Sequence, residues 1–318
     1  MPFARRSLSC GMIVFFLSGE LSAQSGSGPA GRPATQQLTT DPGVDIDAAY
    51  TPDAKFVVYS SSRSGSLELW MRPIDGGAVQ QLTTSVNSSA DRNPSVAPGG
   101  GTVVFQSDRV NRTRNIWAMD LRTRSLSQLT SLADGASNPA VSSKGDICFT
   151  RSYANGNLSI WVMSSDGRNP REIGNGLDCS WTPDGAQVVF SRSADSRAAS
   201  GQYDLWIMDS DGQNSRVLLS TGDAWERSPS VSPDGKVVVF TRYEGTFSSD
   251  LVEVPGGFQV RRGLSAGIWS VSMTGGAATQ VTERTSFNSF ASFSPDGKSI
   301  VFTSDRAGSA DLWVTRMP

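Results

Sequence analysis

Ser294-Pro-Asp-Gly-Lys-Ser-Ile-Val-Phe-Thr-Ser-Asp-Arg306 is the clearest copy of a phrase that recurs six times in this 318-residue chain. In each copy a turn leads into a β-branched run that ends in Phe or Tyr, and in one copy this run is shorter. An aliphatic residue and a tryptophan follow, and six of the eight tryptophans occupy this position. The copies span 51–59, 97–105, 142–149, 182–190, 232–240 and 294–302, and their tryptophans are Trp70, Trp117, Trp161, Trp206, Trp269 and Trp313.

Each repeat unit predicts four short antiparallel strands. The first ends just before the turn, the second is the β-branched run, and the third holds the tryptophan. A Gln-Leu-Thr element or a variant of it supplies the fourth, at 81–84, 128–131, 217–220 and 280–283, with a weak version at 171–174. Repeats of this length with four strands are typical of propeller blades. The sequence therefore predicts an all-β, six-bladed β-propeller of four-stranded antiparallel blades.

The two ends of the chain predict how this ring closes. The last unit stops after its third strand, whereas an additional Gln37-Leu-Thr-Thr40 precedes the first unit. We expect the N-terminal strand 37–40 to join the last blade, because this pairing removes an open sheet edge.

Composition excludes several classes of function. The chain has no histidine, which removes Ser-His-Asp and Cys-His nucleophiles and histidine metal sites. Its formal net charge is −2, and its basic residues form no block, so no nucleic-acid surface is expected.

The N-terminal residues resemble an export signal. Arg5 and Arg6 precede a short apolar run, and Ser22-Ala23 offers small residues for cleavage. We therefore expect a signal peptide at 1–23, a flexible linker at 24–35 and the propeller at 36–318. No later segment is apolar enough to span a membrane, so we expect a soluble protein that the signal exports to the periplasm or the medium. We also expect a monomer.

The repeat phrase resembles that of the TolB-type six-bladed propellers, a WD40-like family built from PD40 repeats. The likeness covers about residues 36–318, and it implies a propeller that binds proteins of the cell envelope. Full-length TolB carries an α/β domain ahead of its propeller, and we expect this chain to lack that domain. Propellers of this kind also accompany prolyl-oligopeptidase hydrolase domains, but the Gly-x-Ser-x-Gly motif and the histidine of such domains are missing here.

Acidic and amide residues recur seven and five positions before the turn proline or its equivalent. Five of them are acids, Arg92 and Arg227 are nearby, and we expect the set to meet at one rim of the central channel. One interpretation is that these side chains cap the strand starts. The other is a cation or polar-ligand site, for which oxygen ligands favour Ca²⁺ or Mg²⁺, with Asp45, Asp91 and Glu226 as candidate metal ligands. The pairs are Asp45 and Asp47, Asp91 and Asn93, Ala136 and Asn138, Gly176 and Asp178, Glu226 and Ser228, Asn288 and Phe290.

The connections between second and third strands are expected to open on the same side as this rim. They are long only in the fourth unit, at 193–203, and in the fifth, at 243–267. The latter predicts an extra hairpin around Pro255-Gly256-Gly257, with Leu251 and Phe258 among its apolar residues. We expect these loops and the acidic rim to form the binding surface for a partner.

Two further expectations concern side-chain pairing. Cys148 and Cys179 fall on neighbouring blades; a disulfide is allowed, but the strand pattern favours two buried free thiols. The Ser-Asp-Arg sequences ending at Arg109 and Arg306 are expected to fix their loops by an internal Asp–Arg salt bridge.

Two function classes stay open. The first is an exported, non-catalytic scaffold that presents its variable face to a protein or peptide and needs no cofactor. The alternative is a lactonase-like hydrolase that holds a divalent cation, Ca²⁺ being the candidate, at carboxylates of the channel mouth. We favour the scaffold because no carboxylate pair departs from the repeat pattern.

Overall fold

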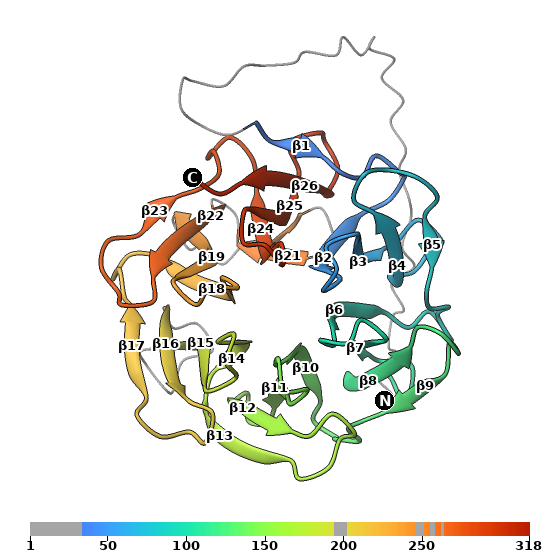
Figure 1. Cartoon of the computed structure of the whole chain (residues 1–318), viewed down its shortest axis with the longest axis horizontal. Coiled ribbons are helices and arrows are strands. Elements are labelled where there is room, and N and C mark those ends of the chain that lie inside the picture. Colours follow the sequence, from blue (N-terminus) through green and yellow to red (C-terminus); the bar gives the residue numbers. More distant parts are fainter. Residues whose placement is uncertain (1–33, 194–201, 246–250, 255–257, 262–263) are drawn as a thin grey trace, which may run out of the picture. The chain divides into compact units, whose positions relative to one another are not determined.

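The structure is a computed structural model that describes residues 34–193, 202–245, 251–254, 258–261 and 264–318. The expected signal peptide and most of the expected linker lie outside these residues. Residues 33–318 form one compact unit, in which six four-stranded antiparallel sheets follow one another around a ring (Figure 1). The predicted six-bladed propeller is confirmed.

Blades 1 to 3 follow the chain from the innermost strand outward. Blade 1 contains β2 (Asp45–Tyr50), β3 (Phe56–Ser61), β4 (Glu68–Pro73) and β5 (Gln80–Gln81). Blade 2 contains β6 (Asp91–Val96), β7 (Thr102–Ser107), β8 (Asn115–Asp120) and β9 (Leu126–Gln128). Blade 3 contains β10 (Ala136–Val141), β11 (Ile147–Ser152), β12 (Leu158–Met163) and β13 (Arg171–Asn175).

Blades 4 to 6 complete the ring. Blade 4 contains β14 (Leu177–Trp181), β15 (Gln187–Ser193), β16 (Tyr203–Asp209) and β17 (Arg216–Leu219). Blade 5 contains β18 (Trp225–Val231), β19 (Val237–Gly245), β22 (Leu264–Ser272) and β23 (Thr279–Gln280). Blade 6 contains β24 (Asn288–Phe293), β25 (Ser299–Ser304), β26 (Asp311–Arg316) and β1 (Gln36–Gln37).

Closure by the N-terminal strand is also confirmed. β1 pairs antiparallel with β26, and the Leu38 N–H donates to the Leu312 carbonyl at 2.7 Å. The Thr39 hydroxyl accepts a bond of 2.9 Å from the Leu312 N–H. The same bond, from the third strand to the threonine of Gln-Leu-Thr, recurs in three other blades, at Thr83, Thr130 and Thr282. The repeated threonine is thus a hydrogen-bond acceptor that holds the outermost strand.

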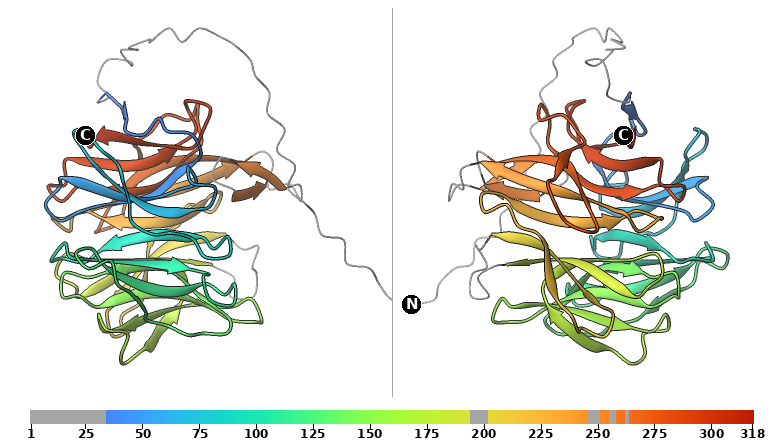
Figure 2. Two further views of the ribbon diagram at one scale, coloured as in Figure 1. Left: turned by 90° about the vertical axis from the view of Figure 1, so that its right-hand side faces the viewer. Right: turned by 60° about the vertical axis from the view of Figure 1, so that its left-hand side comes forward.

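The hydrophobic core lies between neighbouring blades. Six clusters of buried residues each combine side chains of two adjacent blades, as the side views of Figure 2 illustrate by the close stacking of the sheets. The aromatic residue that ends each repeat phrase is fully buried in this layer; these residues are Tyr59, Phe105, Phe149, Phe190, Phe240 and Phe302.

Each repeated tryptophan is covered by an arginine of its own blade. The guanidinium carbon lies between 4.6 and 5.1 Å from the ring centroid in all six blades, within cation–π range. The pairs are Arg63 and Trp70, Arg109 and Trp117, Arg151 and Trp161, Arg192 and Trp206, Arg242 and Trp269, and Arg306 and Trp313.

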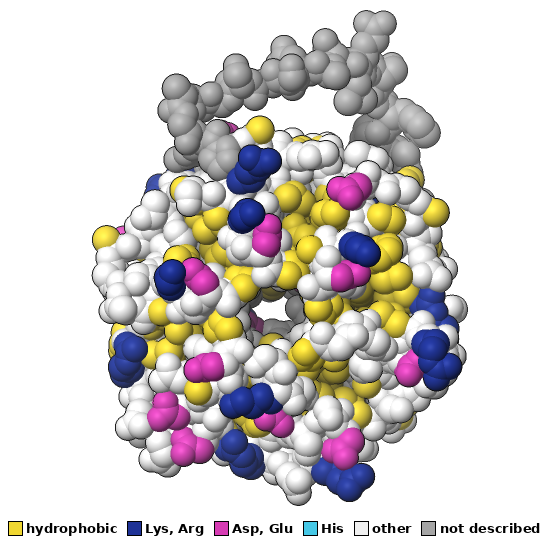
Figure 3. All heavy atoms as spheres, viewed as in Figure 1, with side chains coloured by type: hydrophobic (Ala, Val, Ile, Leu, Met, Phe, Trp, Pro, Cys, Tyr) yellow, Lys and Arg dark blue, Asp and Glu magenta, His cyan; other side chains and the backbone are white. Residues whose placement is uncertain are grey.

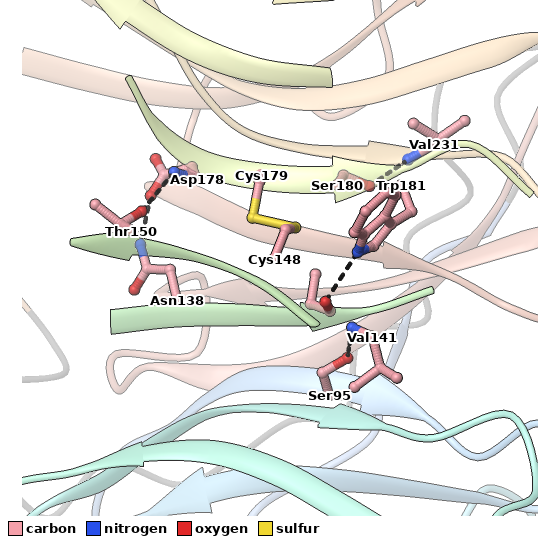
Figure 4. Close-up of a disulfide and its surroundings, with 11 residues drawn as sticks. Ser95, Asn138, Val141, Cys148, Thr150, Asp178, Cys179, Ser180, Trp181 and Val231 are labelled. Carbon is pink, nitrogen blue, oxygen red and sulfur yellow. Dashed lines mark hydrogen bonds between the residues drawn. A yellow bond between two sulfur atoms is a disulfide. The ribbon is translucent and has the colours of Figure 1, made fainter. Parts of the chain in front are cut away.

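The expectation of two free thiols is wrong. Cys148 of β11 and Cys179 of β14 form a disulfide across a Cα–Cα distance of 6.3 Å, which joins blades 3 and 4 (Figure 4). Both cysteines do occupy small apolar positions of their strands, as the pattern indicated. The two strands belong to adjacent sheets, however, and this packing brings the thiols within bonding distance.

Antiparallel order places the connections on two faces of the ring. We use the name turn face for the side that carries the turns after the first and third strands of each blade, such as 51–55 and 74–79. The loop face carries the strand ends that the other connections join, such as Ser193, Tyr203, Gly245 and Leu264. There β20 (Leu251–Val254) and β21 (Phe258–Arg261) pair as a separate hairpin, which confirms the prediction; its Pro-Gly-Gly turn is outside the described residues. No helix capable of crossing a membrane occurs in the described part of the chain.

Candidate functional site

The six innermost strands line a central channel, which contains a hollow of about 280 Å³. Figure 3 looks along it and shows the opening, with hydrophobic side chains gathered around it. Each of these strands has a β-bulge at the same place, and the first unpaired residue has a positive φ of 51 to 57°. These residues all line the hollow; they are Asp47, Asn93, Asn138, Asp178, Ser228 and Phe290.

The bulges are held from the preceding blade. The Asn138 N–H donates to the Gln106 side chain at 3.0 Å, and the Asp178 N–H donates to the Thr150 hydroxyl at 3.1 Å. The Phe290 N–H donates to the Thr241 hydroxyl at 3.0 Å. Side chains of one blade thus fix the lining of the next, which makes the channel wall a preorganised surface.

Two aspartates of the lining form ion pairs with arginines of the next blade. Asp178 Oδ2 lies 2.7 Å from Arg227 Nε, and its other oxygen accepts from the Asn138 amide (Figure 4 shows Asn138 and Asp178). Asp47 Oδ2 lies 3.1 Å from Arg92 Nε, but Asp47 Oδ1 is buried without a hydrogen-bond partner in the described structure. The predicted residues Asp47, Arg92, Asp178 and Arg227 are therefore brought to the channel wall.

Asp45 and Asp91 do not reach the channel, contrary to the prediction. Both are fully buried inside their blades and lie against an arginine of the same blade. Arg109 Nη2 lies 2.6 Å from Asp91 Oδ2, and Arg63 Nη2 lies 3.3 Å from Asp45 Oδ2. The expected pairing of Arg109 with Asp108 is thus also wrong, since Asp108 instead accepts from the Ala90 N–H at 2.7 Å. Burial nevertheless raises the pKa of the Asp45 carboxyl, although Arg63 and hydrogen bonds counteract this.

Glu226 is the third candidate metal ligand, and it too is fully buried away from the channel lining. Burial raises its pKa from 4.5 to about 7, and the nearby charge of Asp204 acts in the same direction. Asp45, Asp91 and Glu226 lie in three different blades. In the residues that the structure describes, no group of three His, Cys, Asp or Glu side chains is arranged to hold a metal ion.

An aromatic cluster that the repeat pattern does not predict lies at the ends of strands on the loop face. Tyr203 and Trp225 meet edge to face with centroids 6.0 Å apart, and Tyr243 and Phe287 lie 5.9 Å apart. The Arg227 guanidinium carbon lies 4.9 Å from the Tyr203 centroid, which connects the cluster to the Asp178 pair at the channel. None of these four aromatic residues belongs to the repeat phrase. Their departure from the repeat is the sequence signal from which the cluster could have been predicted.

The fifth-blade insertion is described only in part. Leu251 and Phe258, predicted to bind a partner, begin β20 and β21, but the positions of their side chains are outside the described structure.

Comparison with known proteins agrees with this geometry. The family model for the TolB beta propeller domain matches residues 29–183. Over these residues, just under half of the chain, the protein is similar to the TolB-type β-propellers. It is 29% identical over 219 residues to the Tol-Pal system protein TolB of Francisella tularensis subsp. tularensis, covering 65% of this chain and 48% of that protein. The chain thus spans about half the length of the curated relatives it matches.

Solved structures share the propeller at low sequence identity. The putative TolB from Agrobacterium tumefaciens superposes with a TM-score of 0.66 at 17% identity, over 88% of this chain and 93% of that one. A gluconolactonase from Xanthomonas campestris superposes with a TM-score of 0.64 at 15% identity, over 91% and 92%. At such identities these likenesses show the fold alone, and a TolB-type propeller therefore shares its architecture with enzymes.

Proposed function

We propose that this TolB-type propeller is an exported, non-catalytic scaffold that binds a protein or peptide of the cell envelope on its loop face. The observation that carries the proposal is the aromatic and arginine cluster of Tyr203, Trp225, Tyr243, Phe287 and Arg227. Tyr, Trp and Arg dominate the binding energy of protein interfaces. The cluster breaks the sixfold repeat beside both long insertions, where selection for a partner has most freedom to act.

The channel mouth supports the same proposal. Its wall is held by hydrogen bonds from the preceding blades, and its two aspartates form ion pairs with arginines. Asp47 Oδ1, however, has no hydrogen-bond partner in the described structure. A partner group that donates a hydrogen bond there would satisfy a buried acceptor, which favours binding.

Export is supported by the disulfide between Cys148 and Cys179, because such bonds persist in oxidising compartments. The Francisella tularensis relative is a Tol-Pal system protein, and we propose that this chain has a similar place in the cell envelope.

The test compares variants on the two faces. Phe287→Ala and Asp47→Asn alter the loop face and the channel, whereas Lys298→Ala removes an exposed side chain on the turn face and serves as control. Proteins of the cell envelope are captured on each immobilised variant and quantified by mass spectrometry. We expect a partner whose capture falls at least tenfold with Phe287→Ala and Asp47→Asn but is unchanged with Lys298→Ala. Equal capture by all three variants would place the binding surface elsewhere.

The alternative function is a divalent-cation-dependent hydrolase, which the shared fold with a gluconolactonase favours. It requires carboxylates gathered around one ion. Lactone hydrolysis that depends on added Ca²⁺ and is lost in Asp47→Asn would support the enzyme over the scaffold.

A further inference from the structure

A buried polar side chain occupies the start of the innermost strand in blades 1, 2, 5 and 6. In blades 1, 2 and 6 it is Asp45, Asp91 or Asn288, and each receives an arginine located four residues after the buried aromatic residue. The distances are 3.3 Å from Arg63 to Asp45, 2.6 Å from Arg109 to Asp91, and 3.0 Å from Arg306 to Asn288. These blades thus match each buried acceptor with a guanidinium donor.

Blade 5 keeps the acid but not the arginine. Its acid is Glu226, and the fourth residue after Phe240 is Glu244. The arginine of this blade, Arg242, is two residues earlier in the repeat and lies 4.7 Å from the Trp269 centroid. Arg242 forms ion pairs with Glu244 at 2.8 Å and with Asp223 at 3.2 Å. Glu226 therefore has no arginine hydrogen-bonded to it in the described structure.

A second buried carboxyl lies on blade 4, in a strand that packs against β18. Asp204, at the start of β16, is also buried, and its charge acts on Glu226. One oxygen of each carboxyl, Glu226 Oε2 and Asp204 Oδ1, is buried without a hydrogen-bond partner, while Glu226 Oε1 accepts from the Thr221 hydroxyl at 2.6 Å. Two buried carboxylates whose charges repel, each with one oxygen that lacks a donor, favour protonation of one of them.

The remaining charges near the pair are already engaged. Arg227 forms an ion pair with Asp178 at the channel, and Arg192 stacks on Trp206. Arg242 lowers the pKa of Glu226, but less than burial and Asp204 raise it. The charged or titratable residues on the strands packed against β18 are Asp178, Arg192, Tyr203, Asp204, Asp209, Arg242, Tyr243 and Glu244, and those on β18 and just before it are Asp223 and Arg227.

We propose that Asp204 and Glu226 are a proton-binding pair that locks the junction of blades 4 and 5 and releases it as the pH rises toward neutrality. In the folded protein the carboxyl of Glu226 has a pKa of about 7, above its ordinary value of 4.5. The folded state therefore holds a proton that the unfolded or opened state loses. The proton stabilises the closed junction fully below about pH 4.5. Between about pH 4.5 and pH 7 the equilibrium constant for closing falls by about tenfold per pH unit, and above about pH 7 this stabilisation is lost.

The junction also carries part of the binding surface. Trp225 precedes Glu226, and Tyr203 precedes Asp204, so the two acids sit directly behind the edge-to-face aromatic pair. Loosening of the junction would separate these rings and weaken partner binding. This consequence rests on the proposed function, whereas the proton-binding pair does not.

Hydrogen exchange tests the pair without any partner. Protection of β18 is measured between pH 5 and pH 9 by mass spectrometry and corrected for intrinsic exchange rates. We expect protection in the wild type to fall by about 40-fold between pH 5 and pH 7 and to level off above pH 8. In Glu226→Gln, which cannot titrate, and in Glu244→Arg, which restores the arginine of the other blades, the fall should disappear. The strand β6, where Asp91 is paired with Arg109, is the control within the same molecule.

An equal pH dependence of β18 and β6 in the wild type would overturn the proposal, and this comparison stands even where a variant fails to fold. Capture of envelope proteins at pH 6 and pH 8 then tests the regulation. Weaker capture at pH 8 in the wild type but not in Glu226→Gln would support it, and equal capture would overturn it. Absence of any captured partner would refute the proposed function and leave the proton-binding pair to the exchange result.

Discussion

The disulfide between Cys148 and Cys179 gives the sharpest test of blade packing. It links strands of two different blades across a sequence separation of 31 residues. The loop-closure relation for a cross-link of this span gives about 3–4 kcal/mol of stabilisation at 25 °C. For a domain of this size a change of 1 kcal/mol shifts the melting temperature by about 2 °C, so reduction should lower it by about 7 °C.

The assay compares thermal unfolding with and without a reductant. Because Cys148 is fully buried and Cys179 is only 6% exposed, the protein is reduced in denaturant and refolded before the measurement. The control is Cys148→Ala with Cys179→Ala, whose melting temperature should not respond to the reductant. A wild-type melting temperature that is the same in both conditions, or a non-reduced digest without the cross-linked peptide, would refute this assignment.

Three further changes test the repeat chemistry, each by chemical denaturation. Ala54 has a φ of 58° where the equivalent Gly235 has 70°, so Ala54→Gly should stabilise the protein by about 0.5–1 kcal/mol and Gly235→Ala should destabilise it by about 1 kcal/mol; the same sign for both would refute the turn assignment. Thr39→Val removes the acceptor of the buried Leu312 N–H and should cost about 1–3 kcal/mol, and a neutral result would mean that the N-terminal strand does not hold blade 6. Arg109→Met leaves the carboxyl of Asp91 buried and unpaired and should cost about 3–5 kcal/mol, part of which Asp91→Asn in the same protein should restore.

The repeat made the fold predictable from sequence. A turn, a β-branched run and a tryptophan in fixed order define three strands, and Gln-Leu-Thr defines the fourth. The unmatched copy at 37–40 also predicted ring closure, because a repeat protein leaves few alternatives for an extra strand.

The site was predicted only in part, because strand alternation fails where the innermost strands bulge. Regular alternation places Asp45 and Asp47 on one face of their strand. In the structure Asp47 is a bulge residue with a φ of 55°, and it reaches the channel while Asp45 turns into the blade. Asn and Asp tolerate this conformation better than most residues, so their recurrence at 47, 93, 138 and 178 was the available signal.

Arginine partners and the disulfide needed three-dimensional packing. Arg109 follows Asp108 in sequence but pairs with Asp91 on another strand. Cys148 and Cys179 each suit a strand interior, and only the contact between blades 3 and 4 distinguishes a disulfide from two thiols. Such contacts depend on how adjacent sheets meet, which a strand pattern does not specify.

Site-specific photocrosslinking tests the central claim, that the loop face binds a partner, most directly. A photoreactive amino acid is placed at Thr285, which is exposed on the loop face beside Phe287, and in a second protein at Lys298, which is exposed on the turn face. We predict that irradiation with envelope proteins gives one discrete crosslinked species from position 285 and none from position 298. A crosslinked species from position 298 alone would contradict the account.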